Sequence, residues 1–390
     1  MPEGIATLLM VVFSMGATWL LWVFLFYPVV VAVLARARPR PLALRDGYEP
    51  TVAFVMAAYN EEHVISARLD NYALLDYPPE KLRFLIGSDA STDQTDTIVR
   101  SYAMRDRSIS LQRFERCGKT RIVYELASQV DAEIVVFTDA DILLEREGVR
   151  RIVRCFSDPT VGGVIGRMVY TDPDAGTGNA GQKKYLELEN GLRRSESLVW
   201  TTVGPRGECF AVRHGAYTPL KDFRLSDDLN LVITIPLNGY RVWYEPSVVI
   251  HETSRRSLGT EYSRRLRMGQ QAAATLLAYP RTRLPWKSWL ALELWSHKLL
   301  RILAAIPLAV IATTSIPLAS VHPVFAAVAI GVGGWTLTIG LGWLGERVAL
   351  HVRAFQYPLK FTAMIVSLTI GSVRGVMYGG LDKWSRNRAE

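Results

Sequence analysis

Residues 134–141 read Ile-Val-Val-Phe-Thr-Asp-Ala-Asp, and this stretch decides the fold that we expect. Its apolar residues are mostly β-branched, which is typical of a buried strand. Two carboxylates, Asp139 and Asp141, follow one residue apart. Polar groups at the carboxyl ends of parallel strands contact ligands, and paired carboxylates can hold a divalent cation against a diphosphate. An acidic turn is the alternative, so the pair has to be interpreted with its surroundings.

Short apolar segments alternate with amphipathic segments between about residues 50 and 252. This alternation is typical of an open, parallel sheet covered by helices. Besides the strand at 134–138, we expect strands at residues 51–57, 82–87, 109–114, 161–169 and 241–250. We expect helices at residues 61–75, 93–105 and 119–130.

Polar side chains follow three of the expected strands. A parallel sheet brings these strand ends to one edge, where one ligand can contact all of them. Asn60 and Asp93 also precede expected helices, so we expect both to cap those helices. Capping does not explain Asp89, nor the pair formed by Asp139 and Asp141.

Residues 116–119 read Arg-Cys-Gly-Lys and stand at the start of an expected helix. Backbone N–H groups at a helix N-terminus, together with Lys119, favour phosphate binding. The spacing is not that of a P-loop. A solvated basic turn is the alternative interpretation.

An apolar N-terminal segment indicates attachment to a membrane. Residues 4–35 contain no charged residue, a length sufficient to cross a bilayer, although a signal peptide is an alternative. Four arginines follow within ten residues, which predicts that the middle of the chain is cytoplasmic. The net charge of +8 then reflects membrane boundaries and anionic lipids rather than nucleic acid, for which we find no motif. Three widely spaced cysteines have no metal-ligand spacing and suit a reducing compartment.

The C-terminal third of the chain is again apolar. Residues 254–299 are basic and rich in tryptophan, which is typical of helices in the membrane interface. Apolar runs follow near residues 302–321, 324–344 and 361–380. The last run contains Arg374, and basic residues follow it in the tail. If all the runs crossed, that tail would lie outside, against the positive-inside rule, so the crossing of the last run stays open.

The order of these motifs resembles the membrane-bound family 2 glycosyltransferases, which include the cellulose, hyaluronan and poly-N-acetylglucosamine synthases. The first matching motifs are Ala-Tyr-Asn-Glu-Glu at 58–62, Asp-Ala-Ser-Thr-Asp at 89–93, Gly-Lys at 118–119 and Thr-Asp-Ala-Asp at 138–141. Later motifs agree with the family at residues 202–213, 226–229, 244–246 and 296–301. The resemblance therefore covers nearly the whole chain.

The resemblance implies an α/β GT-A fold, which is Rossmann-like with a mostly parallel sheet, joined to transmembrane helices. It implies an inverting transfer from a UDP-sugar to a glycan acceptor at the cytoplasmic face of the plasma membrane. The product would be a β-linked polysaccharide. The expected division is an N-terminal membrane helix and basic flank at 1–45, the GT-A domain at 46–252, interface helices at 253–300 and a membrane region at 301–390.

The resemblance also implies roles for particular residues. Asp228 would be the catalytic base, and Asp139 and Asp141 would hold Mg²⁺ or Mn²⁺. The nucleotide would be bound by Ala58, Tyr59, Glu61, Asp89, Lys119, Asp139 and Arg267. The acceptor would be bound by Gly207, Glu208, Asp227, Arg264 and Met268.

One motif departs from the family. Polymerising members carry Gln-x-x-Arg-Trp, whereas residues 264–268 read Arg-Arg-Leu-Arg-Met. Methionine packs well but offers no flat ring on which an acceptor sugar can stack. A single transfer to a lipid acceptor is therefore the alternative to polymer synthesis. A transporter and a non-catalytic nucleotide-sugar sensor are the competing interpretations outside enzymology, and no stretch of sequence identifies the sugar.

Overall fold

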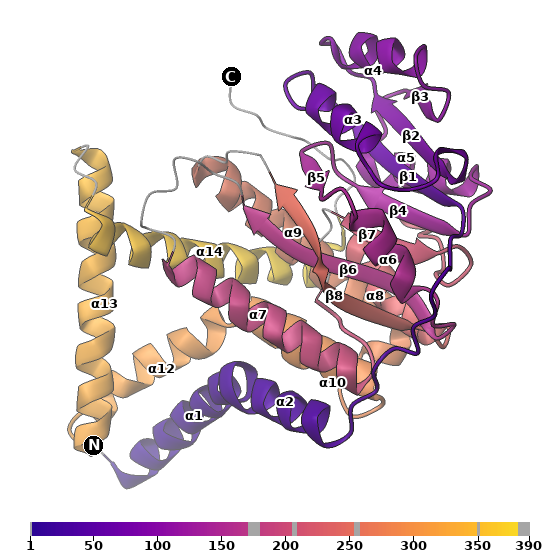
Figure 1. Ribbon diagram of the computed structural model, residues 1–390. Coiled ribbons are helices and arrows are strands. Elements are labelled where there is room, and N and C mark those ends of the chain that lie inside the picture. Colours follow the sequence, from indigo (N-terminus) through magenta and orange to yellow (C-terminus); the bar gives the residue numbers. More distant parts are fainter. Residues whose placement is uncertain (1, 171–179, 205–208, 253–257, 349–351, 381–390) are drawn as a thin grey trace. The chain divides into compact units, whose positions relative to one another are not determined.

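The computed structural model describes residues 2–170, 180–204, 209–252, 258–348 and 352–380 (Figure 1). The chain forms two compact units. The sheet unit comprises residues 31–255, and the helical unit comprises residues 1–30 together with 256–380. Gly207 and Glu208, two of the expected acceptor-binding residues, lie outside the described residues.

The sheet unit is built on an eight-stranded sheet in the order β3-β2-β1-β4-β7-β6-β8-β5. Strands β1, β2, β3 and β4 pair in parallel, as do β6 and β8. The expected α/β class with a mostly parallel sheet is therefore confirmed. The strands expected from the sequence are present as β1 (Val52–Ala58), β2 (Leu82–Asp89), β3 (Ile109–Phe114), β4 (Ile134–Thr138), β6 (Val161–Tyr170) and β8 (Arg241–Glu252).

Two further strands were not expected from the sequence. β7 (Cys209–Arg213) lies in the middle of the sheet and pairs antiparallel with both β4 and β6. It occupies the end of residues 202–213, one of the later motifs that resemble the family. β5 (Ile142–Leu144) pairs antiparallel with β8. Both strands are short and mostly buried, so neither shows the period-two alternation that marks a half-buried strand.

Helices cover the sheet where the sequence placed them, with shifted ends. The described helices of this unit are α3 (Ile65–Ala73), α4 (Thr95–Ala103), α5 (Lys119–Ser128), α6 (Gly148–Cys155), α7 (Ala180–Val199) and α8 (Asp227–Leu237). The expected cap at Asn60 is wrong, because α3 begins only at Ile65. Asn60 instead has φ 53°, a left-handed conformation that asparagine tolerates.

The core of the sheet unit contains a fully buried arginine side chain. Arg68 on α3 is fully buried, with its guanidinium carbon 4.8 Å from the ring centre of Phe84 and 5.3 Å from that of Phe54. Burial lowers the pKa of Arg68 to about 10, so the side chain remains charged at neutral pH. Stacking on aromatic rings offsets part of the cost of its desolvation.

The helical unit contains the apolar segments. Within the described part of the chain, three helices are long and apolar enough to cross a membrane: residues 3–37, residues 323–347 and residues 354–378. Residues 289–302 and 305–318 would add a fourth if they form one broken span, bent by 58°. The helices are α1 (Glu3–Leu21), α9 (Leu258–Ala278), α10 (Trp289–Glu293), α11 (Leu300–Ile302), α12 (Ala305–Leu318), α13 (Pro323–Arg347) and α14 (Arg353–Tyr378). Helix α2 (Tyr27–Ala37) begins in this unit and continues into the residues of the sheet unit.

Candidate active site

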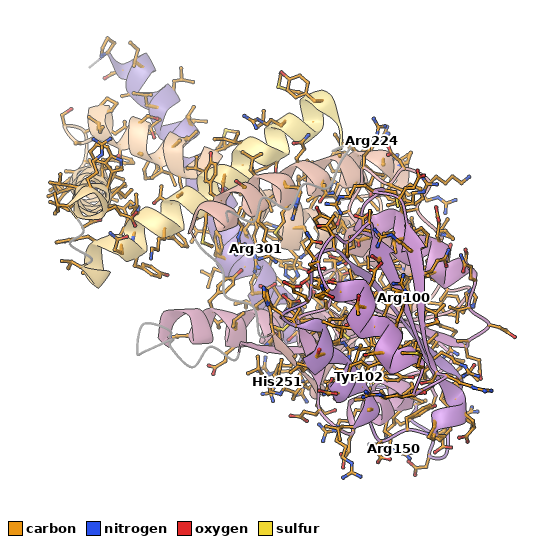
Figure 2. The ribbon with its side chains drawn as sticks, turned by 90° about the horizontal axis from the view of Figure 1, so that it is seen from above. Arg100, Tyr102, Arg150, Arg224, His251 and Arg301 are labelled. Atoms are coloured by element: carbon orange, nitrogen blue, oxygen red, sulfur yellow. The ribbon has the colours of Figure 1, made fainter. Side chains whose placement is uncertain are left out.

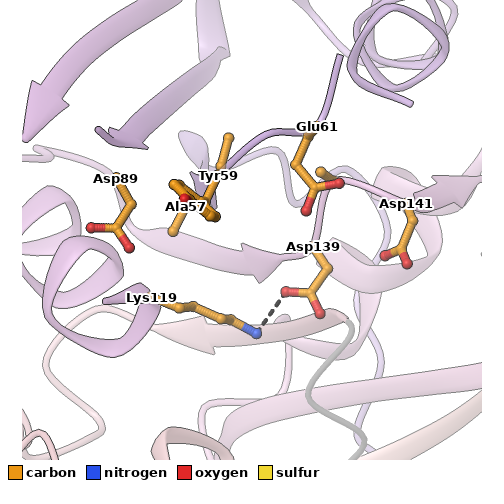
Figure 3. Close-up of a pocket in the computed structure, with 9 residues that line it drawn as sticks. Ala57, Tyr59, Glu61, Asp89, Lys119, Asp139 and Asp141 are labelled. Carbon is orange, nitrogen blue, oxygen red and sulfur yellow. Dashed lines mark ion pairs between the residues drawn. The ribbon is translucent and has the colours of Figure 1, made fainter. Parts of the chain in front are cut away.

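A pocket opens at the carboxyl ends of β1, β2 and β4, as the sequence predicted (Figure 3). All seven expected nucleotide and metal residues of the sheet unit line it, and so do Ala57 and Ala140, which we did not single out. The small side chains of these two alanines leave room between the acidic groups. The lining residues are Ala57, Ala58, Tyr59, Glu61, Asp89, Lys119, Asp139, Ala140 and Asp141.

An ion pair joins the two charged motifs of the pocket. The Nζ atom of Lys119 lies 2.6 Å from Oδ1 of Asp139, as Figure 3 shows by the dashed line. Burial alone would lower the pKa of Lys119. The carboxylates of Asp139, Asp227 and Asp228 outweigh this effect and raise the pKa above its ordinary value of 10.5. Lys119 therefore carries a fixed positive charge where a diphosphate would need one.

Close packing fixes the position of Lys119. It is the first residue of α5 and follows Gly118, which has φ 91°. The helix also lies against Gly87 of β2, where a Cβ atom would come within 2.1 Å of Ile122. Only glycine at residue 87 allows α5 to approach the sheet this closely, so the sequence sets the distance between Lys119 and the strand ends.

Two aspartates at the end of β4 can contribute to a metal site. Asp139 is one third exposed, whereas Asp141 is 8% exposed and directly precedes β5. Among the described residues, no group of three or more His, Cys, Asp or Glu side chains could hold a metal ion. A pair of carboxylates nevertheless fits Mg²⁺ or Mn²⁺, because such ions take one or two carboxylates and complete their shell with phosphate oxygens and water.

Asp89 organises the turn that carries Lys119. Its carboxylate is 1% exposed and accepts hydrogen bonds from the backbone N–H groups of Cys117 at 2.7 Å and Gly118 at 3.1 Å. It also forms an ion pair with Arg116. The Arg116 guanidinium carbon lies 3.4 Å from the ring centre of Tyr59. The contacts of Arg116 with Asp89 and Tyr59 were not expected from the sequence. The expected contact of Asp89 with the nucleotide remains a prediction.

The turn after β1 is tied to the turn after β2. The Asn60 side chain accepts a hydrogen bond from the N–H group of Thr92 at 2.9 Å. Asp93 accepts hydrogen bonds from the N–H groups of Thr95 at 3.0 Å and Glu62 at 3.1 Å. Asp93 is therefore not the N-cap of α4, which is Gln94, although its side chain accepts a hydrogen bond from the first helical residue, Thr95. Asn60, in contrast, stabilises the rim of the pocket instead of a helix.

The expected catalytic base lies at the start of α8. Ser226 caps this helix by accepting a hydrogen bond from the N–H group of Leu229 at 3.3 Å. Asp227 and Asp228 follow as the first two helical residues and are half-buried. Both raise the pKa of Lys119, so the structure brings the acidic pair into electrostatic range of the pocket.

A buried polar contact, which the sequence analysis did not find, holds α8 against α5. Asn230 is fully buried and donates hydrogen bonds to the hydroxyl of Tyr124 at 2.9 Å and to the carbonyl of Thr218 at 3.1 Å. The ring of Tyr124 packs on Phe137 of β4, with ring centres 5.7 Å apart. One tyrosine therefore contacts the helix of the expected base and the strand of the aspartate pair. No local pattern could reveal it, because the contact joins residues 106 positions apart.

The remaining expected residues lie on α9, in the helical unit. Arg264 and Arg267 are half-buried there, and Met268 is 41% exposed. Their expected contacts with acceptor and donor remain predictions.

Comparison with known families identifies the chain. The family model described as “Glycosyltransferase like family 2” matches residues 50–270, more than half of the sequence. The chain belongs to this family. The match includes β1 to β8 and every pocket residue of this family 2 glycosyltransferase.

Similar curated proteins are membrane-lipid and polysaccharide synthases by name. The chain is 24% identical over 230 residues to poly-beta-1,6-N-acetyl-D-glucosamine synthase of Staphylococcus aureus, covering 58% of this chain and 55% of that protein. It is 26% identical over 238 residues to beta-monoglucosyldiacylglycerol synthase of Synechocystis, covering 58% of this chain and 50% of that protein. The chain thus spans about half the length of the curated relatives that it matches.

A solved structure has the same fold. The mannosyltransferase PcManGT from Pyrobaculum calidifontis, in complex with GDP-Man and Mn²⁺, superposes with a TM-score of 0.67. The likeness covers 94% of this chain and 99% of that chain at 24% identity. It therefore extends beyond the family match into the apolar C-terminal segments of this glycosyltransferase.

Proposed function

We propose that this family 2 glycosyltransferase transfers a sugar from a UDP-sugar to a glycan acceptor, with inversion, at the cytoplasmic face of the cell membrane. The observation that carries the proposal is the arrangement of Lys119, Asp139 and Asp141 in one pocket, with Asp227 and Asp228 in electrostatic range. A phosphate-binding cation, a metal-binding pair and a base are the three groups that this chemistry requires.

The donor diphosphate would lie beside Lys119. A charged hydrogen bond from its ammonium group would compete with the present ion pair to Asp139. When bound by Asp139 and Asp141, Mg²⁺ or Mn²⁺ would neutralise charge on the leaving diphosphate. The Mn²⁺ in the mannosyltransferase structure supports this choice of ion.

Asp228 would remove the proton from the attacking hydroxyl of the acceptor. Inversion places the attacking hydroxyl and the leaving diphosphate on opposite faces of the sugar, and groups on separate elements can approach the sugar from both sides. Asp228 lies on α8 and Lys119 on α5. The neighbouring Asp227 and the α9 residues Arg264, Arg267 and Met268 would contact acceptor and donor, as would Gly207 and Glu208.

Single transfer to a lipid acceptor is the second candidate function. The Synechocystis relative supports it, because its name describes the synthesis of a glucosylated diacylglycerol. Met268, in place of an aromatic residue, also favours release after one transfer. The Staphylococcus aureus relative supports polymer synthesis instead.

Nucleotide release and product mass test both candidates. The protein, reconstituted in nanodiscs, would be mixed in turn with UDP-glucose, UDP-N-acetylglucosamine and GDP-mannose. We expect UDP release with one of the first two donors and a product ladder spaced by one sugar mass. A single added mass on lipid would favour the second function. Absence of nucleotide release from every donor, with glycan and diacylglycerol acceptors present, would contradict the proposal.

A further inference from the structure

The last long helix, α14, carries an apolar stripe on its exposed side. Val366, Ile370, Val373 and Met377 are each more than one third exposed and recur at helical spacing. Residues spaced by four, three and four positions lie on one face of a helix. The opposite face, which includes Gly371 and Gly375, is buried.

The buried face of α14 packs closely against α9. A Cβ atom at Gly371 would come within 2.0 Å of the carbonyl oxygen of Leu266, and one at Gly375 within 2.2 Å of that of Gln270. Ser372 also donates a hydrogen bond to the Gly269 carbonyl at 3.3 Å. The contact residues advance together on both helices, so α9 and α14 run in parallel, backbone against backbone.

This close packing against α9 constrains where α14 can lie. The α9 segment beside it contains three arginines within four residues, at positions 264, 265 and 267. Charged side chains at the centre of a bilayer cost about 2.5–3.5 kcal/mol each on insertion scales. A helix fixed along such a segment belongs at the membrane surface.

The charges on α14 itself lead to the same location. The uncharged segment between Lys360 and Arg374, residues 361–373, is only about 20 Å long. The hydrocarbon core is about 30 Å thick. By contrast, α13 is uncharged from residue 324 to residue 345, about 33 Å, and can cross fully.

The orientation of α14 relative to α13 favours different placements for the two helices. Figure 1 shows α14 running across α13, and in Figure 2 α13 is seen end-on while α14 lies lengthwise. Gln356 of α14 donates a hydrogen bond to the Gly342 carbonyl of α13 at 3.0 Å, close to the basic end of α13. Membrane-spanning helices tilt by about 20° on average, so a helix that lies lengthwise where its neighbour is seen end-on is better placed in the plane of the membrane.

We propose that α14 is an in-plane docking helix for the cytoplasmic surface of the bilayer and does not cross it. The apolar stripe enters the boundary between head groups and acyl chains, while Lys360 and Arg374 contact anionic head groups. This placement keeps the basic residues before and after α14 on one side of the membrane. It therefore resolves the conflict with the positive-inside rule that a crossing would create.

Depth measurement by nitroxide labelling tests this placement. Single cysteines at Val366, Ile370, Val373 and Met377 would be introduced in a Cys117→Ser background, and oxygen and nickel accessibility would be measured in vesicles with anionic lipid. We expect the four labels to lie at one shallow depth, although residues 366 and 377 are about 16 Å apart along the helix. Labels at Val324, Ile330 and Leu337 of α13, all exposed, are the matched control and should differ in depth by up to about 20 Å.

A depth gradient along α14 like that along α13 would overturn the proposal. A C-terminal alkaline phosphatase fusion gives an independent readout. We expect it to be inactive and a C-terminal green fluorescent protein to fluoresce, whereas an active phosphatase would also overturn the proposal. Neither measurement depends on sugar transfer, so failure here is distinct from failure of the proposed function.

Discussion

At the scale of single residues, the site depends on Lys119 and the carboxylates around it. Its ion pair with Asp139 at 2.6 Å holds the Lys119 ammonium group beside the pocket. The raised pKa means that Lys119 stays protonated at any pH below its ordinary value of 10.5.

Removing this charge should weaken nucleotide binding. We expect Lys119→Met to lower UDP affinity by about 10–100-fold, because a charged hydrogen bond contributes about 1.5–3 kcal/mol. Lys119→Arg is the matched control, since it keeps the charge, and should lose less. Titration calorimetry at pH 7 and pH 9 measures both. A fall in wild-type affinity that tracks loss of the lysine proton between these values would contradict the raised pKa.

Removing the base should slow transfer without weakening nucleotide binding. Asp228→Asn keeps the shape of the side chain but cannot accept the proton, so we expect kcat to fall by about 10²–10⁴-fold. UDP affinity measured by calorimetry should change little. If the variant transfers sugar at the native rate, Asp228 has a structural role, and Asp227→Asn becomes the next variant to measure.

At the scale of elements, the strands that are followed by site residues could be predicted from the sequence, whereas β5 and β7 could not. Alternating apolar segments gave β1, β2, β3 and β4, and the polar residues after them gave the pocket. β7 has five residues and β5 has three, most of them buried, and strands this short carry no periodic signal. The expected cap at Asn60 is wrong because the Asn60 side chain accepts a hydrogen bond from the backbone of Thr92 instead of from a helix.

The contact between Tyr124 and Asn230 should set the position of α8. We expect Tyr124→Phe to lower kcat by about 3–10-fold and stability by about 1 kcal/mol, because Asn230 then loses a buried acceptor. The KM for the donor should stay within about twofold of wild type, since the contact acts on the base helix. Tyr217→Phe is the matched control, as its ring packs on Phe137 in the same cluster. Both variants keep the ring and lose only a hydroxyl, so equal effects on kcat would show that the contact with Asn230 has no specific role.

The close packing between α9 and α14 should not tolerate even one added methyl group. We expect Gly371→Ala to destabilise the protein by about 1–3 kcal/mol, because the added Cβ atom would meet a backbone carbonyl at 2.0 Å. Gly331→Ala in α13 is the matched control. No atom lies within 4 Å of its added methyl group, and alanine favours the helix. Thermal unfolding in detergent compares the two, and a Gly371→Ala protein as stable as the control would contradict the close packing.

At the scale of the whole molecule, sequence and structure agree that a glycosyltransferase domain is combined with apolar helices. The apolar runs were visible because length and hydropathy are local properties. Their use was not: α14 has the length of a span, yet its partner helix and its orientation to α13 favour the membrane surface. Contacts between segments about a hundred residues apart decide this, and no window of sequence contains them.

The central claim is that the end of β4 is the donor site, with a cation held between Asp139, Asp141 and the diphosphate. Calorimetric titration of UDP into the wild-type protein with Mn²⁺, into the same protein with EDTA, and into Asp141→Asn with Mn²⁺ tests it most directly. We predict tight binding only in the first case, with affinity lower by about 10-fold or more in the other two, which is typical of a lost charged interaction. Equal UDP affinity in all three titrations would contradict the account.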